Sequence, residues 1–266
     1  MDYEAALSDL VEWARGAAGV RALVLTGSGA AGGAHRLSDR DVEVFSVNPE
    51  GLLADESWWA ELGEVLVVER LEDADGNPTR LIYYVGGKID FTVLPVTALT
   101  GRSYERPFEV LFDMSGEAAE LIQAPTSWSP PSAEDFNESL NWAYAAALMC
   151  AKAIVRDEPW SAKLRDNDFK DQLLEMIEWD HRSRYGSDFD TRYLGTRMNR
   201  WMDSDVRDAL ATCWGRFDPR DSADALRRTS DLYGALAVRT AAALELPSCV
   251  DHQRVREEIE TILAEA

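Results

Sequence analysis

An apolar run that ends at a glycine-serine turn, followed by two closely spaced aspartates, constrains the fold of this chain most. The run ends at Gly27 and Ser28, and Asp39 and Asp41 stand about ten residues further on, at the start of an alternating apolar stretch. Successive side chains of a strand point to opposite faces, so Asp39 and Asp41 share one face. Two neighbouring carboxylates raise each other's pKa or require a counter-cation. The pattern therefore predicts a divalent cation at the start of a strand.

A third acid, Asp90, lies in another alternating, β-branched run at positions 88–94. If this strand lies beside the strand of Asp41, the three carboxylates form one cluster. Hard oxygen ligands of this kind favour Mg²⁺ together with substrate phosphates. Gly27 lets the backbone approach a phosphate, and Ser28 adds a hydroxyl donor. This set indicates phosphoryl or nucleotidyl transfer, with Asp90 as a metal ligand or as the base that takes a proton from the acceptor hydroxyl.

With these residues the chain resembles the DNA polymerase β-like nucleotidyltransferase superfamily. Its signature is Gly-Ser, a spacer of about ten residues, Asp-x-Asp on a strand, and a third Asp on a later strand. Asp41 and Glu43 satisfy a looser acid-apolar-acid-apolar form on the same strand face. We prefer Asp39 with Asp41, because Ser-Asp-x-Asp before an apolar strand is the more usual form, and keep Glu43 as the reserve ligand.

The composition is that of a soluble globular protein, with 266 residues of which 46% are hydrophobic. No stretch approaches the roughly 20 apolar residues of a membrane span, and the N-terminus lacks a signal-like segment. Cys150, Cys213 and Cys249 have no metal-ligand spacing and fit reduced thiols. We therefore expect a cytoplasmic protein without a membrane partner, and favour a monomer.

The charge balance is strongly acidic, with 27 Lys and Arg against 48 Asp and Glu and a formal net charge of −21. Nucleic acids are drawn to basic surfaces, so this charge argues against a DNA or RNA partner. Acidity alone is compatible with mere solubility. Joined to a nucleotidyltransferase motif, it indicates a small polycationic acceptor.

The pattern of elements changes after the first hundred residues, which predicts two domains. The first domain, 1–125, reads as a mixed β-sheet with helices, and the second, 132–266, reads as an α-helical bundle, with Pro125, Pro130 and Pro131 in the linker. The fold class is thus α/β followed by all-α. Strands are expected at about 22–25, 41–47, 64–69, 81–85 and 89–94. Helices are expected at about 3–18, 132–155, 162–183, 190–201, 204–213, 222–244 and 250–264.

Two runs in the helical half sharpen the resemblance. Residues 151–163 read Ala-Lys-Ala-Ile-Val-Arg-Asp-Glu-Pro-Trp-Ser-Ala-Lys, and residues 173–179 read Leu-Leu-Glu-Met-Ile-Glu-Trp. Both are similar to the second domain of the bacterial streptomycin (aminoglycoside 6-) adenylyltransferases, and the likeness extends over most of the chain. It implies transfer of AMP from ATP to a hydroxyl of an aminoglycoside such as streptomycin, with release of pyrophosphate.

Three basic residues in this region, Lys152, Arg156 and Lys163, are candidates to hold the ATP phosphates. Lys152 and Arg156 are four residues apart and share a helix face, so the three could face the carboxylate cluster across an interdomain cleft. The alternative is that they are solvated or pair with acids nearby in the sequence. Relatives usually carry Arg after Gly-Ser, whereas positions 29–33 here are basic-free, so either Arg36 takes over that phosphate contact or nucleotide binding is weaker.

Acidic and aromatic residues of the helical half could build the acceptor pocket. Glu138 and Glu178, with Asp180, are candidates for the cationic groups, and Trp142 and Trp179 for apolar or cation-π walls. Packing in the helix core is the alternative for both tryptophans. Two further functions stay open: a nucleotidyltransferase with another acceptor, such as a lincosamide or a protein, and a degenerate, non-catalytic protein that binds nucleotide or basic partners.

Overall fold

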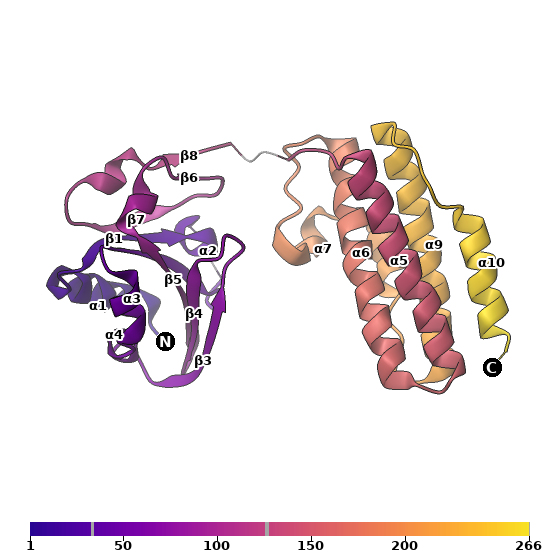
Figure 1. Ribbon diagram of the computed structural model, residues 1–266, viewed down its shortest axis with the longest axis horizontal. Helices are drawn as coiled ribbons and strands as arrows, with labels where there is room; N and C mark the ends of the chain where they lie inside the picture. The colour runs from indigo at the N-terminus through magenta and orange to yellow at the C-terminus, as the bar shows by residue number, and fades with distance from the viewer. Residues whose placement is uncertain (33–34, 126–127, 266) are drawn as a thin grey trace. The chain divides into compact units, whose positions relative to one another are not determined.

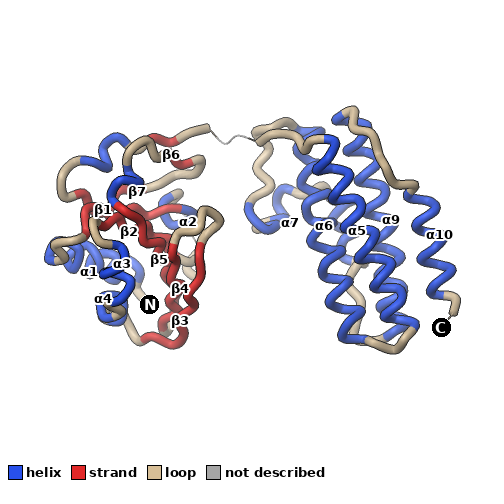
Figure 2. Tube along the Cα trace, in the orientation of Figure 1, coloured by secondary structure: helices blue, strands red, loops and turns tan. Residues whose placement is uncertain are grey.

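The computed structural model describes residues 1–32, 35–125 and 128–265, and the chain divides into two compact units, Met1–Thr126 and Ser127–Ala266 (Figure 1). The first unit carries the sheet and the second is helical, as the secondary-structure colours show (Figure 2). The expected fold class, a mixed sheet followed by a helical bundle, is confirmed. Within the described residues, no helix combines the length and the hydrophobicity that a membrane crossing requires.

A six-stranded mixed sheet with the strand order β3-β4-β5-β2-β1-β7 forms the centre of the first unit. Its neighbouring strands pair antiparallel except β2 and β5, which are parallel. Two short strands form a separate parallel pair. The strands are β1 (Val20–Thr26), β2 (Arg40–Ser46), β3 (Val65–Glu72), β4 (Pro78–Tyr84), β5 (Gly87–Pro95), β6 (Ser103–Tyr104), β7 (Glu109–Asp113) and β8 (Ile122–Gln123).

The two faces of this sheet differ in what covers them. Helices α1 (Tyr3–Gly16), α3 (Pro49–Ala54) and α4 (Ser57–Ala60) bury one face, and the ring of Trp58 in α4 stacks on Trp13 at 4.7 Å (Figure 1). On the other face, the 3-10 helices η1 (Val96–Leu99) and η2 (Glu117–Glu120) cover the end of the sheet around Phe45 and Leu94. Asp41, Glu43, Asp90 and Thr92 lie on the same face, beyond this covered end.

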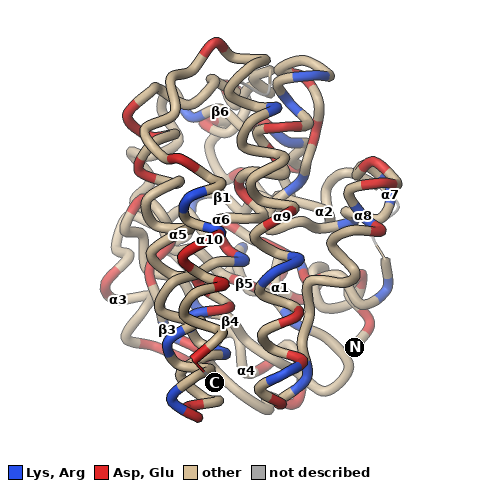
Figure 3. Tube along the Cα trace, turned by 90° about the vertical axis from the view of Figure 1, so that its right-hand side faces the viewer, with Lys and Arg blue, Asp and Glu red and all other residues tan. Residues whose placement is uncertain are grey.

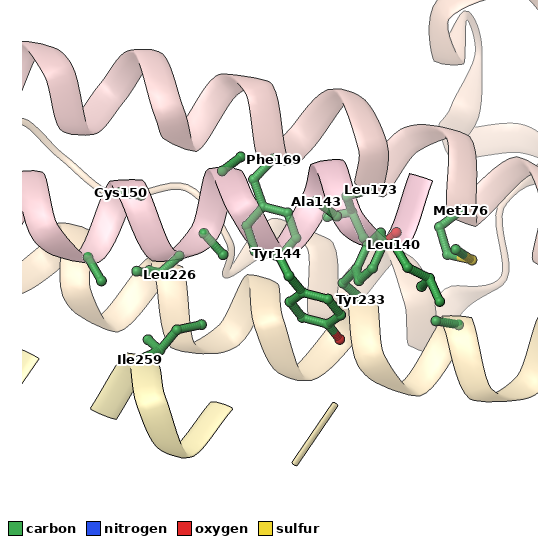
Figure 4. Close-up of a cluster of buried hydrophobic side chains, with 14 of the residues drawn as sticks. Leu140, Ala143, Tyr144, Cys150, Phe169, Leu173, Met176, Leu226, Tyr233 and Ile259 are labelled. Carbon is green, nitrogen blue, oxygen red and sulfur yellow. The ribbon is translucent and has the colours of Figure 1, made fainter. Parts of the chain in front are cut away.

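The helical unit packs around one apolar core. Helices α5, α6, α9 and α10 contribute Leu140, Phe169, Tyr233 and Ile259 to it, all less than 2% exposed (Figure 4). Helix α5 begins with a capping box, in which Ser132 and Asp135 exchange hydrogen bonds. The helices are α5 (Ala133–Val155), α6 (Pro159–Tyr185), η3 (Tyr193–Gly195), α7 (Met198–Trp201), α8 (Ser204–Ala211), α9 (Pro219–Leu244) and α10 (His252–Leu263).

The departures from the sequence-based expectations include one broken helix and one edge strand. The single helix expected at 190–201 is broken into η3 and α7, because Leu194, Gly195 and Arg197 have positive φ angles of 46°, 66° and 57°. Strand β7 was not expected from the sequence: it is a short edge strand beside β1, and its own residues are half-exposed or exposed. Neither difference touches the region where the acids gather.

Candidate active site

The parallel pairing of β2 and β5 places two of the three acids side by side. Asp41 is the direct partner of Asp90 in the register, so both side chains lie on the same face of the sheet. Asp39 precedes β2, and the Nζ of Lys88 joins it to the cluster, at 3.0 Å from Asp39 Oδ2 and 2.8 Å from Asp90 Oδ2. The structure thus brings Asp39, Asp41 and Asp90 together, with an ammonium between two of them.

Asp41 and Asp90 are more costly to ionise than ordinary carboxyls. Burial, and then the charges of Asp90 and Asp39, raise the pKa of Asp41 to about 6. Burial also raises the pKa of Asp90, although Lys88 opposes the shift. Burial alone would lower the pKa of Lys88, but its hydrogen bonds to Asp90 and Asp39 raise it above its ordinary value. The positive charge of Lys88 therefore does not fully offset the cost of ionising both Asp41 and Asp90.

Two observations show that the donor set suits a hard divalent cation. Asp90 Oδ1 is buried and has no hydrogen-bond partner, and no described residue donates a hydrogen bond to the Asp41 carboxylate. Unpaired carboxylate oxygens in a partly buried position are ligands that Mg²⁺ accepts. Across residues 1–32, 35–125 and 128–265, no group of three or more His, Cys, Asp or Glu side chains is already placed as a metal site. The fit rests on donor chemistry and on the unpaired oxygen.

The glycine-serine turn touches this cluster directly. Strand β1 ends at Thr26, the partner of Asp41 in the register, and the short helix α2 (Gly27–Ala30) follows. Gly27 has a φ of +65°, and a Cβ at this position would lie 2.4 Å from Asp41 Oδ2. Only glycine allows this approach, because any side chain would displace the carboxylate. Ser28 is exposed beside it.

The spacer after this turn is described only in part. Gly33, in the basic-free stretch, lies outside the described residues, as does Ala34. Arg36 is exposed and makes no ion pair with the part of the chain that the structure describes. Its guanidinium is therefore available, but its phosphate role stays a prediction.

Glu43, the reserve ligand, has partners of its own. Its carboxylate accepts hydrogen bonds from Arg102 and from the Tyr104 hydroxyl, and its side chain is 13% exposed. Both partners lie in the segment that follows η1, about sixty residues further along the chain. The geometry therefore favours Asp39 over Glu43 as the companion of Asp41.

The three basic candidates lie around the turn between α5 and α6, at the end of the bundle opposite the start of α5 (Figure 1). Lys152 is exposed and has no ion-pair partner among the described residues. Arg156 pairs with Glu158, as the alternative interpretation held, whereas the Nζ of Lys163 donates to the backbone oxygen of Gly215 at 2.7 Å. Contact of these residues with phosphate stays a prediction.

The acceptor candidates differ in exposure. Trp142 is 65% exposed, and its Nε1 donates to Glu138 Oε1 at 3.4 Å. Trp142 also lines a cavity of about 350 Å³ between α5 and α6. The other lining residues are Ala145, Ala146, Met149, Arg165, Asp168, Asp171 and Gln172. Trp142 is thus placed to meet a ligand, and the cavity carries both acidic and basic groups at its wall.

The candidates on α6 are tied to the protein itself. Trp179 packs against the helical core with its ring 6.1 Å from that of Phe136. Asp180 is fully buried between Arg184 and Arg239, which neutralise it. Burial raises the pKa of Glu178, with Arg182 opposing the shift. The structure therefore does not bring the α6 residues into the cavity lined by Trp142.

Lys88, Arg102 and Tyr104 are site residues that the sequence analysis missed. Lys88 could have been found, because it stands two residues before Asp90 and must share its strand face. The contact of Arg102 and Tyr104 with Glu43 joins distant segments, and no sequence spacing indicates it.

A mixed sheet with a glycine-serine turn against paired aspartates, followed by a helical unit, is the arrangement expected of a nucleotidyltransferase. Comparison with known proteins assigns the family. The sequence model of the streptomycin adenylyltransferase family matches residues 2–261, and the chain therefore belongs to this family of nucleotidyl-transferring enzymes. A crystal structure of an aminoglycoside 6-adenyltransferase from Bacillus subtilis is similar, with a TM-score of 0.49 and 17% identity over 96% of this chain and 97% of that chain. No curated protein matches the chain.

Proposed function

We propose that this enzyme transfers AMP from ATP to a hydroxyl of a small cationic acceptor, with aminoglycosides such as streptomycin as the leading class. The observation that carries the proposal is the direct pairing of Asp41 with Asp90, with Asp39 linked to the same cluster. The family supports the nucleotidyl chemistry. The net charge of −21 supports a cationic acceptor and opposes a nucleic acid, and Figure 3 shows acidic segments spread over the chain with basic segments between them.

In this proposal Asp39, Asp41 and Asp90 hold Mg²⁺. The ion supplies neutralisation of the charge that develops on the phosphate oxygens and the attacking and leaving oxygens. The backbone at Gly27 lies against the same cluster, and it would orient a phosphate there together with the hydroxyl of the exposed Ser28. Asp90 Oδ1, which is buried and without a partner, would either bind this ion or take the proton of the acceptor hydroxyl.

The other proposed contacts, with the ATP phosphates and with the acceptor, come from residues outside the carboxylate cluster. Arg36 and Lys152, which lack ion-pair partners among the described residues, together with Arg156 and Lys163, are proposed phosphate contacts. Glu138 and Trp142, with Glu178 and Trp179, are proposed acceptor contacts, and the exposure of Trp142 gives that residue the best support.

The proposal also assigns a role to each domain and a location in the cell. We assign catalysis to residues 1–125, and substrate and nucleotide binding to 132–266, in a monomer. A cytoplasmic site of action fits the need for ATP and the free thiols of all three cysteines.

The test is incubation of the protein with ATP, Mg²⁺ and a panel of aminoglycosides, lincosamides and neutral sugars, followed by mass spectrometry of each acceptor. We expect an AMP adduct on a cationic aminoglycoside, and none with Asp41→Ala. A lincosamide adduct, or a labelled protein instead of a small molecule, would contradict the acceptor assignment. ATP binding without any transfer would contradict the catalytic assignment.

A further inference from the structure

Lys88 occupies the centre of the carboxylate cluster, and the sequence analysis gave it no role. Its side chain is 15% exposed, and its Nζ donates to Asp39 Oδ2 and Asp90 Oδ2 at 3.0 and 2.8 Å. An ammonium is a compact cation with three donors on a flexible stem, so it can bridge acids that come from two different strands. The contact therefore holds Asp39 against the β5 side of the cluster.

This ammonium does not satisfy the whole cluster. The Asp41 carboxylate receives no hydrogen bond from any described residue, and Asp90 Oδ1 is buried without a partner. The Lys88 ammonium thus contacts two of the three acids. A divalent ion carries more charge and takes several oxygen ligands at once. Its ligands would include the unpaired Asp90 Oδ1 and the Asp41 carboxylate, which lie beside the Oδ2 atoms of Asp39 and Asp90 that Lys88 now holds.

We propose that Lys88 is a built-in counter-cation that holds Asp39 and Asp90 in place without metal and gives up these oxygens when a divalent ion binds. Lys88 is thus a positioning residue. Its tether keeps the displaced ammonium beside the site, where the Tyr83 ring lies 5.3 Å from Nζ. The apo protein avoids unshielded repulsion between its acids, and free metal binds weakly because it must first displace the ammonium. This inference rests on the proposed metal site.

Arg40 provides a matched control that separates the loss of a nearby positive charge from the loss of the Lys88 contacts. Arg40 also contributes a positive charge near Asp41. Its guanidinium, however, donates to the backbone oxygens of Ser38 and Asp39 and lies over the Tyr3 ring at 4.1 Å. Loss of Arg40 therefore changes the local field without vacating the position between the acids.

The experiment measures Mn²⁺ binding by electron paramagnetic resonance in the full-length protein without nucleotide, for the wild type, Lys88→Met, Lys88→Arg and Arg40→Met. We expect Lys88→Met to bind Mn²⁺ at least about tenfold more tightly than the wild type, since a cation within about 4–6 Å alters carboxylate equilibria by that order. Arg40→Met should tighten binding by less than about threefold, and Lys88→Arg should not tighten it.

Thermal unfolding gives a second expected result. In EDTA, Lys88→Met should melt below the wild type, and Mg²⁺ should raise its Tm by more than it raises that of the wild type. A purely structural loss would lower metal affinity as well as Tm, so tighter binding together with a lower apo Tm distinguishes the two.

A third measurement needs no variant. The ¹⁵Nζ signal of Lys88 in the wild type should move as Mg²⁺ is added, because the ammonium leaves its two carboxylates. Unchanged or weaker Mn²⁺ binding by a folded Lys88→Met, equal tightening by Arg40→Met, or an unmoved ¹⁵Nζ signal at saturating Mg²⁺ would each overturn the role of Lys88. If no variant and no wild-type protein binds Mn²⁺, the proposed metal site fails as well.

Discussion

At the scale of single residues, the backbone of Gly27 and the carboxylate of Asp41 approach so closely that one side-chain atom would separate them. A Cβ at Gly27 would lie 2.4 Å from Asp41 Oδ2, and the φ of +65° would add strain for any other residue. Gly32 has a similar φ of +68°, but a Cβ there would meet nothing within 4 Å. Substitutions at Gly27 and at Gly32 therefore separate the cost of backbone strain, which both share, from the cost of displacing Asp41, which only Gly27 carries.

We expect Gly27→Ala to lower kcat/KM for AMP transfer by about a hundredfold, because displacement of a catalytic group by about 1 Å can cost that much. Gly32→Ala should leave kcat/KM within about twofold. Both variants should lose about 1–2 kcal/mol of unfolding free energy from the positive φ. Initial rates and urea unfolding measure the two effects. Equal losses of activity in the two variants would contradict a special role for Gly27.

Glu43 offers a second contrast at this scale. Because its carboxylate is bound by Arg102 and Tyr104, Glu43→Gln should lower the unfolding free energy by about 1–3 kcal/mol and leave kcat within about threefold. Asp39→Asn should instead lower kcat at least a hundredfold and leave the fold intact. Circular dichroism and initial rates in Mg²⁺ measure both. A reversal of the two activity effects would make Glu43 the companion of Asp41.

The acids of the candidate site could be predicted because they follow from local patterns. Asp39, Asp41 and Asp90 stand in alternating strands, and the alternation fixes the face of each. The environment of each acid could not be predicted in the same way. The partners of Glu43 come from a distant segment of the chain. Whether a tryptophan is buried depends on which helix packs on it, and Trp179 lies against the core whereas Trp142 is exposed.

At the scale of elements, end signals determined how well each helix or strand could be predicted. The capping box at Ser132 fixes the start of α5 locally, whereas α6 and α9 begin at Pro159 and Pro219, three residues before the expected starts. Strand β7 has only five residues and forms because β1 offers it an edge. The stretch 190–201 has enough apolar residues for a helix, but Gly195 lies against Met198 and Leu174 with a positive φ and ends the helix there.

Helix α10 gives a pH-dependent prediction. His252, its first residue, is half-buried, and burial lowers the pKa of its imidazole, with Asp251 opposing the shift. The Tyr144 hydroxyl lies 2.6 Å from its Nδ1. The unfolded state therefore protonates first as the pH falls below about 6.5, and stability declines from there down to the folded pKa.

The measurement is the unfolding free energy between pH 8 and pH 5 for the wild type and His252→Gln. We expect the wild type to lose more stability than the variant over this range, with the difference arising below about pH 6.5. Equal pH slopes for the two proteins would mean that His252 is solvated in the folded state. Asp251→Asn, which removes the opposing charge but keeps the imidazole, should retain a steep slope.

At the scale of the whole molecule, two separate cores explain why the division of the chain could be predicted. The sheet unit and the helical unit each bury their own apolar cluster, and each has its own hydrophobic period in the sequence, two for strands and 3.6 for helices.

The net charge is a property of the whole chain and gives a last prediction, which rests on the proposed acceptor. A formal charge of −21 attracts a polycation and repels ATP over distances that salt shortens, from about 30 Å at 0.01 M to about 3 Å at 1 M. The KM for the aminoglycoside should therefore rise several-fold between about 20 mM and 500 mM potassium acetate. The KM for ATP, measured in the same series at fixed free Mg²⁺, should stay level or fall. Circular dichroism at both salt concentrations controls for unfolding, and an acceptor KM that does not change with salt would show that the acidic surface plays no part in drawing in the acceptor.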